Sequence, residues 1–274
     1  MKVHVALLLV LSFALPAPSR AEHEGKIQIL LFGDSTTEAK FPKLLAPQEP
    51  QFEDLVRLLL AAEGDLPPAR AINLGLSGEF IRRLLDSGRY VKDAAGLPGL
   101  DYIFIRYGLN DRAKREGFEA NFPQDFRELL VKLRSDHPEA ILIPTTVIPY
   151  LDEAASTAIN DLIRSVATAE KLTLFDIYPR YAAELKRGPD MLNYRRMALG
   201  KIPENLRELA SHYVIPGPAQ EVVVLDNRLD AHFGSLPGWF GDRHPNLAGY
   251  HVIASETAKF LAPLIRAKAK GPGK

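Results

Sequence analysis

The sequence contains no cysteine, only one tryptophan and three methionines, and no excess of charge of either sign. The absence of cysteine excludes disulfides, thiolate metal sites and a cysteine nucleophile. The 34 Lys and Arg residues balance the 34 Asp and Glu residues. The composition therefore indicates neither a nucleic-acid groove nor an anchor for acidic membranes.

An apolar run stands at the N-terminus, where Lys2 precedes residues 5–14. Residues 19–21 (Ser-Arg-Ala) then place small side chains where signal cleavage requires them. The run is shorter than the roughly 20 residues that span a bilayer. We expect a secretory signal over residues 1–21, cleaved after Ala21, and no stable membrane span. An exported protein without disulfides fits the bacterial periplasm or exterior.

The rest of the 274-residue chain is 46% hydrophobic and 25% charged, which is typical of a soluble globular protein. Its β-rich runs alternate with helical patterns, which favours a parallel sheet with helices on both faces, a doubly wound α/β sandwich. The expected strands cover residues 26–33, 71–74, 102–106, 140–146 and 172–177, and the expected helices cover 52–62, 80–85, 122–133, 155–170 and 246–265. Ligands of such sheets sit at the carboxyl ends of the strands.

Residues 179–241 interrupt this alternation. They are rich in Pro, Gly, Arg and aromatic residues and contain one strand-like run at 221–225. We interpret them as a lid-like insertion or a small subdomain within a single domain over residues 22–274. Trp239, with Phe240, either stacks on a sugar or packs the insertion.

The first expected strand ends in Gly33-Asp34-Ser35-Thr36-Thr37-Glu38. A serine between a strand and a helix is well placed for nucleophilic attack, and the N–H groups of the helix start can hold an oxyanion. Ser35 and Glu38 would also form a capping box. Thr36 stands where an aspartate-nucleophile phosphatase would need a second carboxylate, and the Gly-Lys-Ser/Thr of a Walker loop is absent.

The next two strands end in loops that carry further candidates. Gly78 lets the backbone approach a ligand closely and point an N–H at it, or forms a plain turn. Ser77 is a rival nucleophile, although the chain contains no G-x-S-x-G elbow. Asn110 offers an amide donor suited to an oxyanion hole, or closes the strand with an Asx turn.

A base for the serine is sought among seven histidines. His244 lies immediately before the closing helix, in a loop that we expect at the carboxyl edge of the sheet. There its imidazole could reach Ser35, with a nearby carboxylate orienting the ring. His137 precedes the strand expected at 140–146, so we expect it at the opposite, amino-terminal edge of the sheet. The alternative for His244 is a loop residue beside a helix cap.

The candidate residues fall in four short sequence blocks. In chain order, the blocks are Gly33-Asp34-Ser35, Gly78, Gly108-x-Asn110-Asp111 and His244-Pro245. Together they resemble the sequence blocks of the SGNH (GDSL-type) hydrolases. The resemblance implies a flavodoxin-like three-layer α/β/α sandwich with a five-stranded parallel sheet. It also implies hydrolysis of esters and thioesters of sugars, lipids or small aryl compounds, without a metal or an organic cofactor.

The resemblance further implies a role for each matching residue. Ser35 would be the nucleophile, and His244 the general base and then the general acid. The oxyanion hole would consist of the N–H groups of Ser35 and Gly78 and the side chain of Asn110.

The acid departs from the family pattern. The family usually carries it three residues before the histidine, where this chain has Gly241; Asp242 stands only two residues before His244. We expect Asp242 to support the imidazole through a tighter turn. Asp226 or Asp230 from the insertion, or a Ser–His dyad without an acid, are the alternatives.

The sequence thus predicts an exported serine esterase that removes O-acetyl groups from carbohydrate through an acyl-Ser35 intermediate. A lipid or aryl esterase, an acyltransferase to a polysaccharide hydroxyl, and a non-catalytic polysaccharide-binding protein are the alternatives. The expected partner is a small-molecule or saccharide ester, not a nucleic acid, and the oligomeric state stays open.

Overall fold

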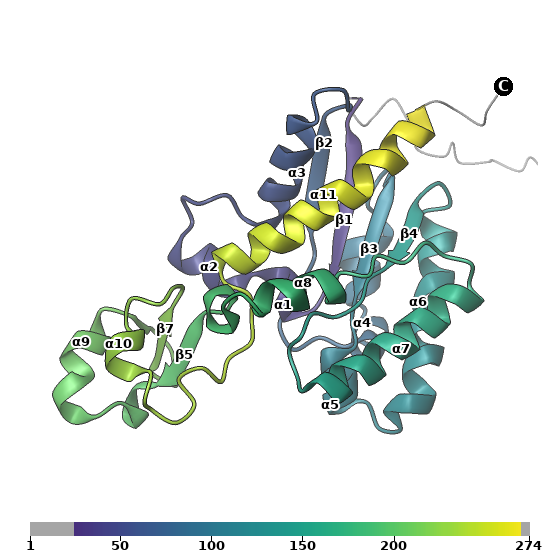
Figure 1. The fold of residues 1–274 in the computed structure, drawn as a ribbon. Coiled ribbons are helices and arrows are strands. Elements are labelled where there is room, and N and C mark those ends of the chain that lie inside the picture. Colours follow the sequence, from purple (N-terminus) through teal and green to yellow (C-terminus); the bar gives the residue numbers. More distant parts are fainter. Residues whose placement is uncertain (1–24, 270–274) are drawn as a thin grey trace, which may run out of the picture.

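The computed structural model describes residues 25–269, so the predicted signal at 1–21 lies outside the described residues. Its main sheet has four parallel strands in the order β2-β1-β3-β4 (Figure 1). The central strands β1 (Ile27–Gly33) and β3 (Tyr102–Arg106) pair with each other. The outer strands are β2 (Ala69–Asn73) and β4 (Ile141–Pro144).

The fifth strand expected at 172–177 does not form, and this part of the prediction is wrong. Only an isolated parallel bridge joins Thr145 to Phe175, with Phe175 N–H donating to Pro144 O at 2.9 Å and Thr146 N–H donating to Phe175 O at 3.1 Å. In a parallel ladder, alternate residues donate to the same neighbour, so the residue two before Thr146 would donate the next N–H to the fifth strand. That residue is Pro144, which has no N–H to donate, so the ladder cannot extend in this direction.

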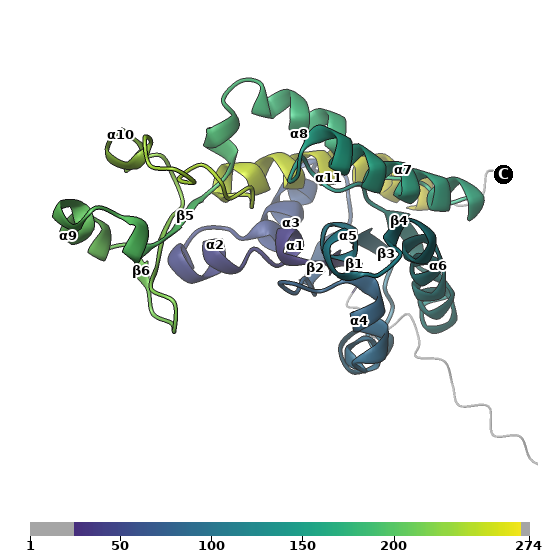
Figure 2. The same ribbon diagram turned by 90° about the horizontal axis from the view of Figure 1, so that it is seen from below.

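Alternate residues of the central strands face two hydrophobic clusters on opposite sides of the sheet. On one side, α3 (Phe52–Ala62) and α11 (Leu247–Ala269) cover the strands. The other cluster is covered by α4 (Ile81–Asp86), α6 (Phe118–Asp136) and α7 (Glu153–Ala169). Figure 2 shows α4 on the side of the sheet away from α11. Burial on both faces explains why these strands read as nearly continuous apolar runs in the sequence.

Short helices follow the strands at the carboxyl edge of the sheet. The remaining elements of the main body are α1 (Ser35–Glu38), α2 (Lys40–Leu45), a π-helical turn (Tyr90–Ala95), α5 (Leu109–Lys114) and α8 (Tyr178–Leu185). Because β1 and β3 are neighbours, α1 and α5 begin side by side. Within residues 25–269, no helix has both the length and the apolar character needed to cross a bilayer.

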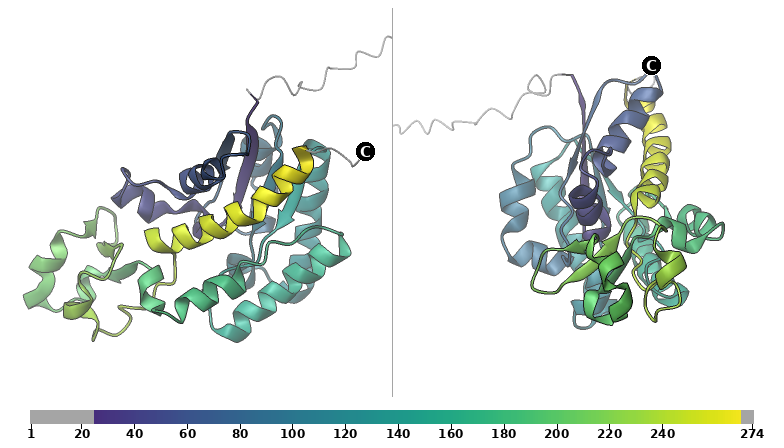
Figure 3. Two further views of the ribbon diagram at one scale, coloured as in Figure 1. Left: turned by 45° about the horizontal axis from the view of Figure 1, so that its top comes forward. Right: turned by 90° about the vertical axis from the view of Figure 1, so that its left-hand side faces the viewer.

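Much of the predicted insertion forms a small unit beside the sheet, drawn in green in Figures 1 and 3. Its antiparallel sheet has the order β5-β7-β6, formed by β5 (Arg195–Ala198), β6 (Val214–Ile215) and β7 (Glu221–Val224). The strand-like run expected at 221–225 is therefore confirmed as β7. Two short helices, α9 (Arg207–Ser211) and α10 (Asp230–Phe233), complete the unit around its own apolar core.

The chain enters the small unit directly beside the loop that carries His244. An antiparallel bridge joins Asn193 to Pro245, and Tyr194 N–H donates to His244 O at 3.2 Å. Asn246 N–H donates to Leu192 O at 2.8 Å. The residues just before the first strand of the small unit therefore lie next to the start of α11.

Trp239 packs inside the small unit. Its side chain is fully buried, meets Phe233 edge-on with ring centroids 5.0 Å apart, and donates its indole N–H to Asp230 Oδ1 at 2.7 Å. Because no face of the indole is exposed, the expected sugar stacking by Trp239 is wrong and the packing alternative holds.

Trp239→Ala should destabilise the small unit by about 3–5 kcal/mol, because it empties the centre of a fully packed core. Trp239→Phe should cost less, since it keeps most of the apolar volume and loses only the bond to Asp230. Urea unfolding followed by far-UV circular dichroism would measure both, with the exposed Leu44→Ala on α2 as control. An unfolding midpoint for Trp239→Ala equal to that of Leu44→Ala would contradict the placement of Trp239 at the centre of this core.

Candidate active site

Ser35 begins α1 immediately after β1, and Asp34 caps that helix. Asp34 is fully buried, and its Oδ1 accepts from the N–H of Thr36 at 2.9 Å and from its hydroxyl at 2.8 Å. Burial raises the pKa of the Asp34 carboxyl, while the bonds from Thr36 and the charge of Arg106 act in the opposite direction. The structure thus assigns the cap to Asp34, which leaves the Ser35 hydroxyl free to face outward.

The capping box expected from Ser35 and Glu38 does not form. The Glu38 carboxylate instead accepts from the N–H of Ser77 at 2.7 Å and from the Ser77 hydroxyl. This contact ties α1 to the loop after β2. It also commits the hydroxyl of the rival nucleophile Ser77 to a carboxylate.

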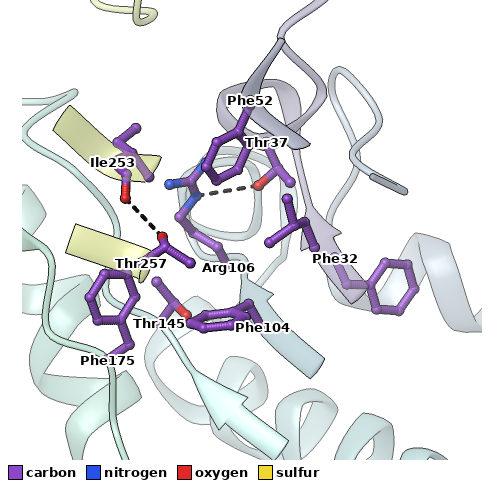
Figure 4. Close-up of a pocket in the computed structure, with 10 residues that line it drawn as sticks. Phe32, Thr37, Phe52, Phe104, Arg106, Thr145, Phe175, Ile253 and Thr257 are labelled. Atoms are coloured by element: carbon purple, nitrogen blue, oxygen red, sulfur yellow. Dashed lines mark hydrogen bonds between the residues drawn. The ribbon is translucent and has the colours of Figure 1, made fainter. Parts of the chain in front are cut away.

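Arg106, the last residue of β3, supports the same turn from below (Figure 4). Its side chain is 4% exposed, donates from Nε to Thr37 Oγ1 at 3.3 Å and from a terminal nitrogen to Thr36 O, and lies over the Phe52 ring. Burial lowers the pKa of Arg106. The adjoining cavity of about 10 Å³ has room for roughly one water, so this region supports the turn and does not hold a substrate.

Ser35 and His244, which are 209 positions apart in the sequence, meet at the carboxyl edge of the sheet. The distance from Ser35 Oγ to His244 Nε2 is 2.8 Å, and His244 Nδ1 lies 2.7 Å from Asp242 Oδ1. The same Asp242 oxygen accepts the backbone N–H of His244 at 2.9 Å. This tight turn is how an acid only two residues before the histidine still reaches the ring.

The alternative acids are engaged elsewhere. Asp226 pairs with Arg228 at 2.5 Å. Asp230 pairs with Arg195 at 2.6 Å and accepts the indole N–H of Trp239. Asp242 is thus the carboxylate in contact with His244.

Three residues that the sequence analysis did not identify surround this pair. The Arg196 Nε lies 2.8 Å from Asp242 Oδ2. The Tyr194 ring stacks on the imidazole of His244, with centroids 5.5 Å apart and planes 7° apart, and Tyr150 meets it edge-on at 4.8 Å. Tyr150 lies in the loop after β4, so the expectation that ligands bind at the carboxyl ends of strands could have identified it. Tyr194 and Arg196 belong to the insertion, where no local pattern distinguishes them.

The electrostatics favour an ionised Asp242. Burial raises the pKa of this carboxyl, but its hydrogen bonds from His244 and the positive charge of Arg196 outweigh burial, so the pKa lies below its ordinary value. A charged Asp242 holds the proton of His244 on Nδ1, which leaves the Nε2 lone pair toward Ser35. Burial also raises the pKa of Tyr150 to about 12, so its hydroxyl stays neutral beside the imidazole.

Gly78 and Asn110 line one pocket of about 280 Å³ together with Ser35 and His244. Gly78 has a φ of 76°, in the left-handed region that favours glycine, and its carbonyl accepts from Lys114 Nζ at 2.6 Å. Asn110 lies in the first turn of α5 instead of an Asx turn. Its amide forms no hydrogen bond to the part of the chain that the structure describes, so it is available to a ligand.

Asp111 fixes the backbone that carries Asn110. Its two oxygens accept the N–H groups of Ile81 and Gly108, each at 2.9 Å, and so join the starts of α4 and α5. Burial raises the pKa of Asp111 to about 7. Gly108 has a φ of 137°, and a Cβ there would lie 2.4 Å from Ile159 Cγ2, so only glycine fits this turn.

The remaining described histidines lie away from the pocket. His137 is buried before β4, where burial lowers its pKa and its Nε2 lies 3.1 Å from Ala94 O. His251 is exposed along α11, and His212 and His232 belong to the small unit. Among residues 25–269, no group of three or more Asp, Glu or His side chains is arranged to hold a metal ion.

A family model described as the GDSL-like lipase/acylhydrolase family matches residues 31–252. The chain belongs to this family. The predicted resemblance is confirmed, and with it the coarse prediction of an enzyme that hydrolyses ester bonds. The match spans all four sequence blocks, from Ser35 to His244.

Solved structures share the fold at low identity. LAE5, an alpha/beta hydrolase from the metagenome of Lake Arreo, is 21% identical with a TM-score of 0.53, over 86% of this chain and 94% of that one. The acetylxylan esterase Axe2 of Geobacillus stearothermophilus is 16% identical with a TM-score of 0.53, over the same shares. The lipase/acylhydrolase of Enterococcus faecalis is 17% identical with a TM-score of 0.51, over 87% and 96%. No curated protein matches the chain.

Arg196→Gln should lower kcat for ester hydrolysis roughly tenfold, or about 1.4 kcal/mol, because Asp242 loses the cation that holds it in place and charged. The pKa of Asp242 should rise, so the rate should begin to fall at a higher pH on the acidic side. Arg196→Lys should return the acidic limb of the pH profile part of the way to its position in the wild type. The pH profile of kcat measures this, with Arg228→Gln, an exposed arginine of the small unit, as control. An acidic limb at the same pH in Arg196→Gln and in the wild type would argue against the support of Asp242 by Arg196.

Proposed function

We propose that the protein is an exported serine esterase that removes O-acetyl groups from carbohydrate through an acyl-Ser35 intermediate. The observation that carries the proposal is the continuous contact from Ser35 Oγ through His244 to Asp242, at 2.8 and 2.7 Å. A nucleophile, a base and an orienting acid in this order are the arrangement that acyl transfer requires.

In the first half-reaction, Ser35 Oγ attacks the ester carbonyl carbon while His244 Nε2 takes the hydroxyl proton. The carbonyl electrons move to the oxygen, which the N–H groups of Ser35 and Gly78 and the amide of Asn110 stabilise. When the intermediate collapses, the bond to the alcohol breaks and His244 returns the proton to the leaving oxygen. Asp242 stays ionised throughout and stabilises the imidazolium.

In the second half-reaction, water replaces the alcohol. His244 takes a proton from water as its oxygen attacks the acyl carbon, and the same donors hold the second oxyanion. Collapse releases acetate and returns the proton to Ser35 Oγ. No step needs a metal or an organic cofactor.

Three observations support an acetylated saccharide as substrate. The pocket of about 280 Å³ is small, and its lining includes the aromatic rings of Phe41, Tyr150 and Tyr194. Aromatic faces of this kind suit the apolar side of a sugar. One protein of the same fold is an acetylxylan esterase. Export rests on the signal-like sequence at residues 1–21.

Two alternatives are distinguished by simple measurements. An acyltransferase would pass the acetyl group to an added saccharide faster than to water. A non-catalytic polysaccharide-binding protein, which the irregular spacing of Asp242 and His244 suggested, would leave Ser35 unreactive.

Ser35→Ala should abolish hydrolysis of p-nitrophenyl acetate and labelling by a fluorophosphonate probe, because both require the Oγ nucleophile. Ser77→Ala is the matched control, since it removes the neighbouring serine hydroxyl that Glu38 holds, and it should still be labelled. Peptide mapping of the labelled protein identifies the site. Full activity in Ser35→Ala, or labelling at Ser77, would refute the proposal.

Asn110→Ala should lower kcat by about 10²–10³, or about 2.7–4 kcal/mol, with little change in KM, because the amide acts on the oxyanion more than on the ground state. Steady-state kinetics on p-nitrophenyl acetate measures this. Asn121→Ala is the control, since that amide is exposed and bonds to Glu116 O. A fall in kcat no larger than that of the control would remove Asn110 from the oxyanion hole.

A further inference from the structure

Two cations line the pocket of Ser35, and no Asp or Glu is among its lining residues within the described chain. Lys40 comes from the start of α2 and Arg196 from β5 of the small unit. Both lie beside one aromatic ring: the centroid of Phe41 is 5.9 Å from Lys40 Nζ and 5.8 Å from Arg196 Cζ. Both cations therefore lie near the same aromatic ring of the pocket lining.

That wall leads to the reacting groups. The Phe41 ring meets the Tyr194 ring edge-on, with centroids 5.3 Å apart and planes 85° apart. Tyr194 in turn stacks on His244, which contacts Ser35. A ligand group held between Lys40 and Arg196 would thus lie along the same wall as the scissile ester.

Both cations retain donors for a ligand. Arg196 uses Nε for Asp242 Oδ2, and its two terminal nitrogens form no hydrogen bond to the part of the chain that the structure describes. Lys40 is exposed and forms no ion pair within residues 25–269. A guanidinium with free terminal nitrogens is well suited to a carboxylate, and an ammonium adds a second charge.

Asp242 offsets much of the charge of Arg196, whereas no carboxylate pairs with Lys40 within residues 25–269. Asp242 is 4% exposed and is held by His244 and Arg196. Glu38 bonds to Ser77, and Glu221 acts on Arg196 only as a more distant charge. Lys114, bonded to Gly78 O, adds a further positive charge beside the oxyanion donors. Lys40 and Lys114, which pair with no carboxylate of residues 25–269, therefore add positive charge at the pocket.

We propose that the substrate is anionic: an O-acetylated acidic saccharide whose carboxylate binds between Lys40 and Arg196 while its acetyl ester meets Ser35. This inference rests on the proposed esterase function and specifies its substrate class. The carboxylate pairs with the two cations, and the sugar ring lies against Phe41. The ester chemistry is unchanged, because the carboxylate takes no part in the bonds that form or break.

The test compares two esters that differ at one carbon, methyl O-acetyl-galactosiduronate and methyl O-acetyl-galactoside, acetylated at the same hydroxyl. Wild-type protein should show a kcat/KM at least about tenfold higher for the acidic ester at low salt, and 0.5 M NaCl should reduce this ratio because screening weakens the charge contact. Lys40→Gln should lower the ratio about fivefold, and Lys40→Glu should lower it further.

Lys43→Gln is the matched control, since it removes the same charge three residues along α2, where Lys43 pairs with Glu53 at 2.8 Å and does not line the pocket. Its ratio should stay close to that of the wild type. An equal kcat/KM for both esters in the wild type, or the same ratio in Lys40→Gln and Lys43→Gln, would overturn the inference.

A binding measurement separates this inference from the esterase proposal. Calorimetry on Ser35→Ala with methyl galactosiduronate and methyl galactoside should show tighter binding of the acid, and weaker binding of the acid after adding Lys40→Gln. Equal binding of the two saccharides overturns the anionic substrate, even when p-nitrophenyl acetate is hydrolysed. Loss of ester hydrolysis in the wild type, with the acid still bound more tightly, overturns the esterase alone.

Discussion

The site depends on one chain of contacts, in which Arg196 holds Asp242, Asp242 holds His244, and His244 meets Ser35. It joins three distant segments of the sequence: the turn after β1, the first strand of the small unit and the loop before α11. Each member is held by the one before it, so the contacts fix the orientation of the imidazole. The approach of His244 to Ser35 therefore depends on how the small unit packs against the parallel sheet.

The sheet supplies the fixed half of this arrangement. Pairing of β1 with β3 places Ser35 and Asn110 at neighbouring strand ends, and two buried charges, Asp34 and Arg106, hold the turn between them. Buried charges cost free energy unless they are paired and hydrogen-bonded. Here they fix the backbone of the turn that carries Ser35, which gives a reason to retain them.

The small unit supplies the variable half. Its core, built around Trp239, is separate from the core of the sheet, yet Arg196 of its first strand and Tyr194, just before that strand, line the pocket. Aromatic rings and cations from the unit meet Phe41 and Lys40 from the main body. Changes in this unit can therefore alter the lining of the pocket while Ser35, Gly78 and Asn110 stay in place.

Local patterns in the sequence determined most strands and helices, and the rule that ligands sit at strand ends brought Ser35, Gly78, Asn110 and His244 to one edge. Tertiary structure alone decided the rest. One absent N–H at Pro144 ends the pairing with a fifth strand on one side, which matters only once β4 has a neighbour. Asp242 reaches His244 through a local turn of two residues. The engagement of Asp226 and Asp230 by other residues, and the arrival of Arg196 at Asp242, depend on tertiary packing, which no local period records.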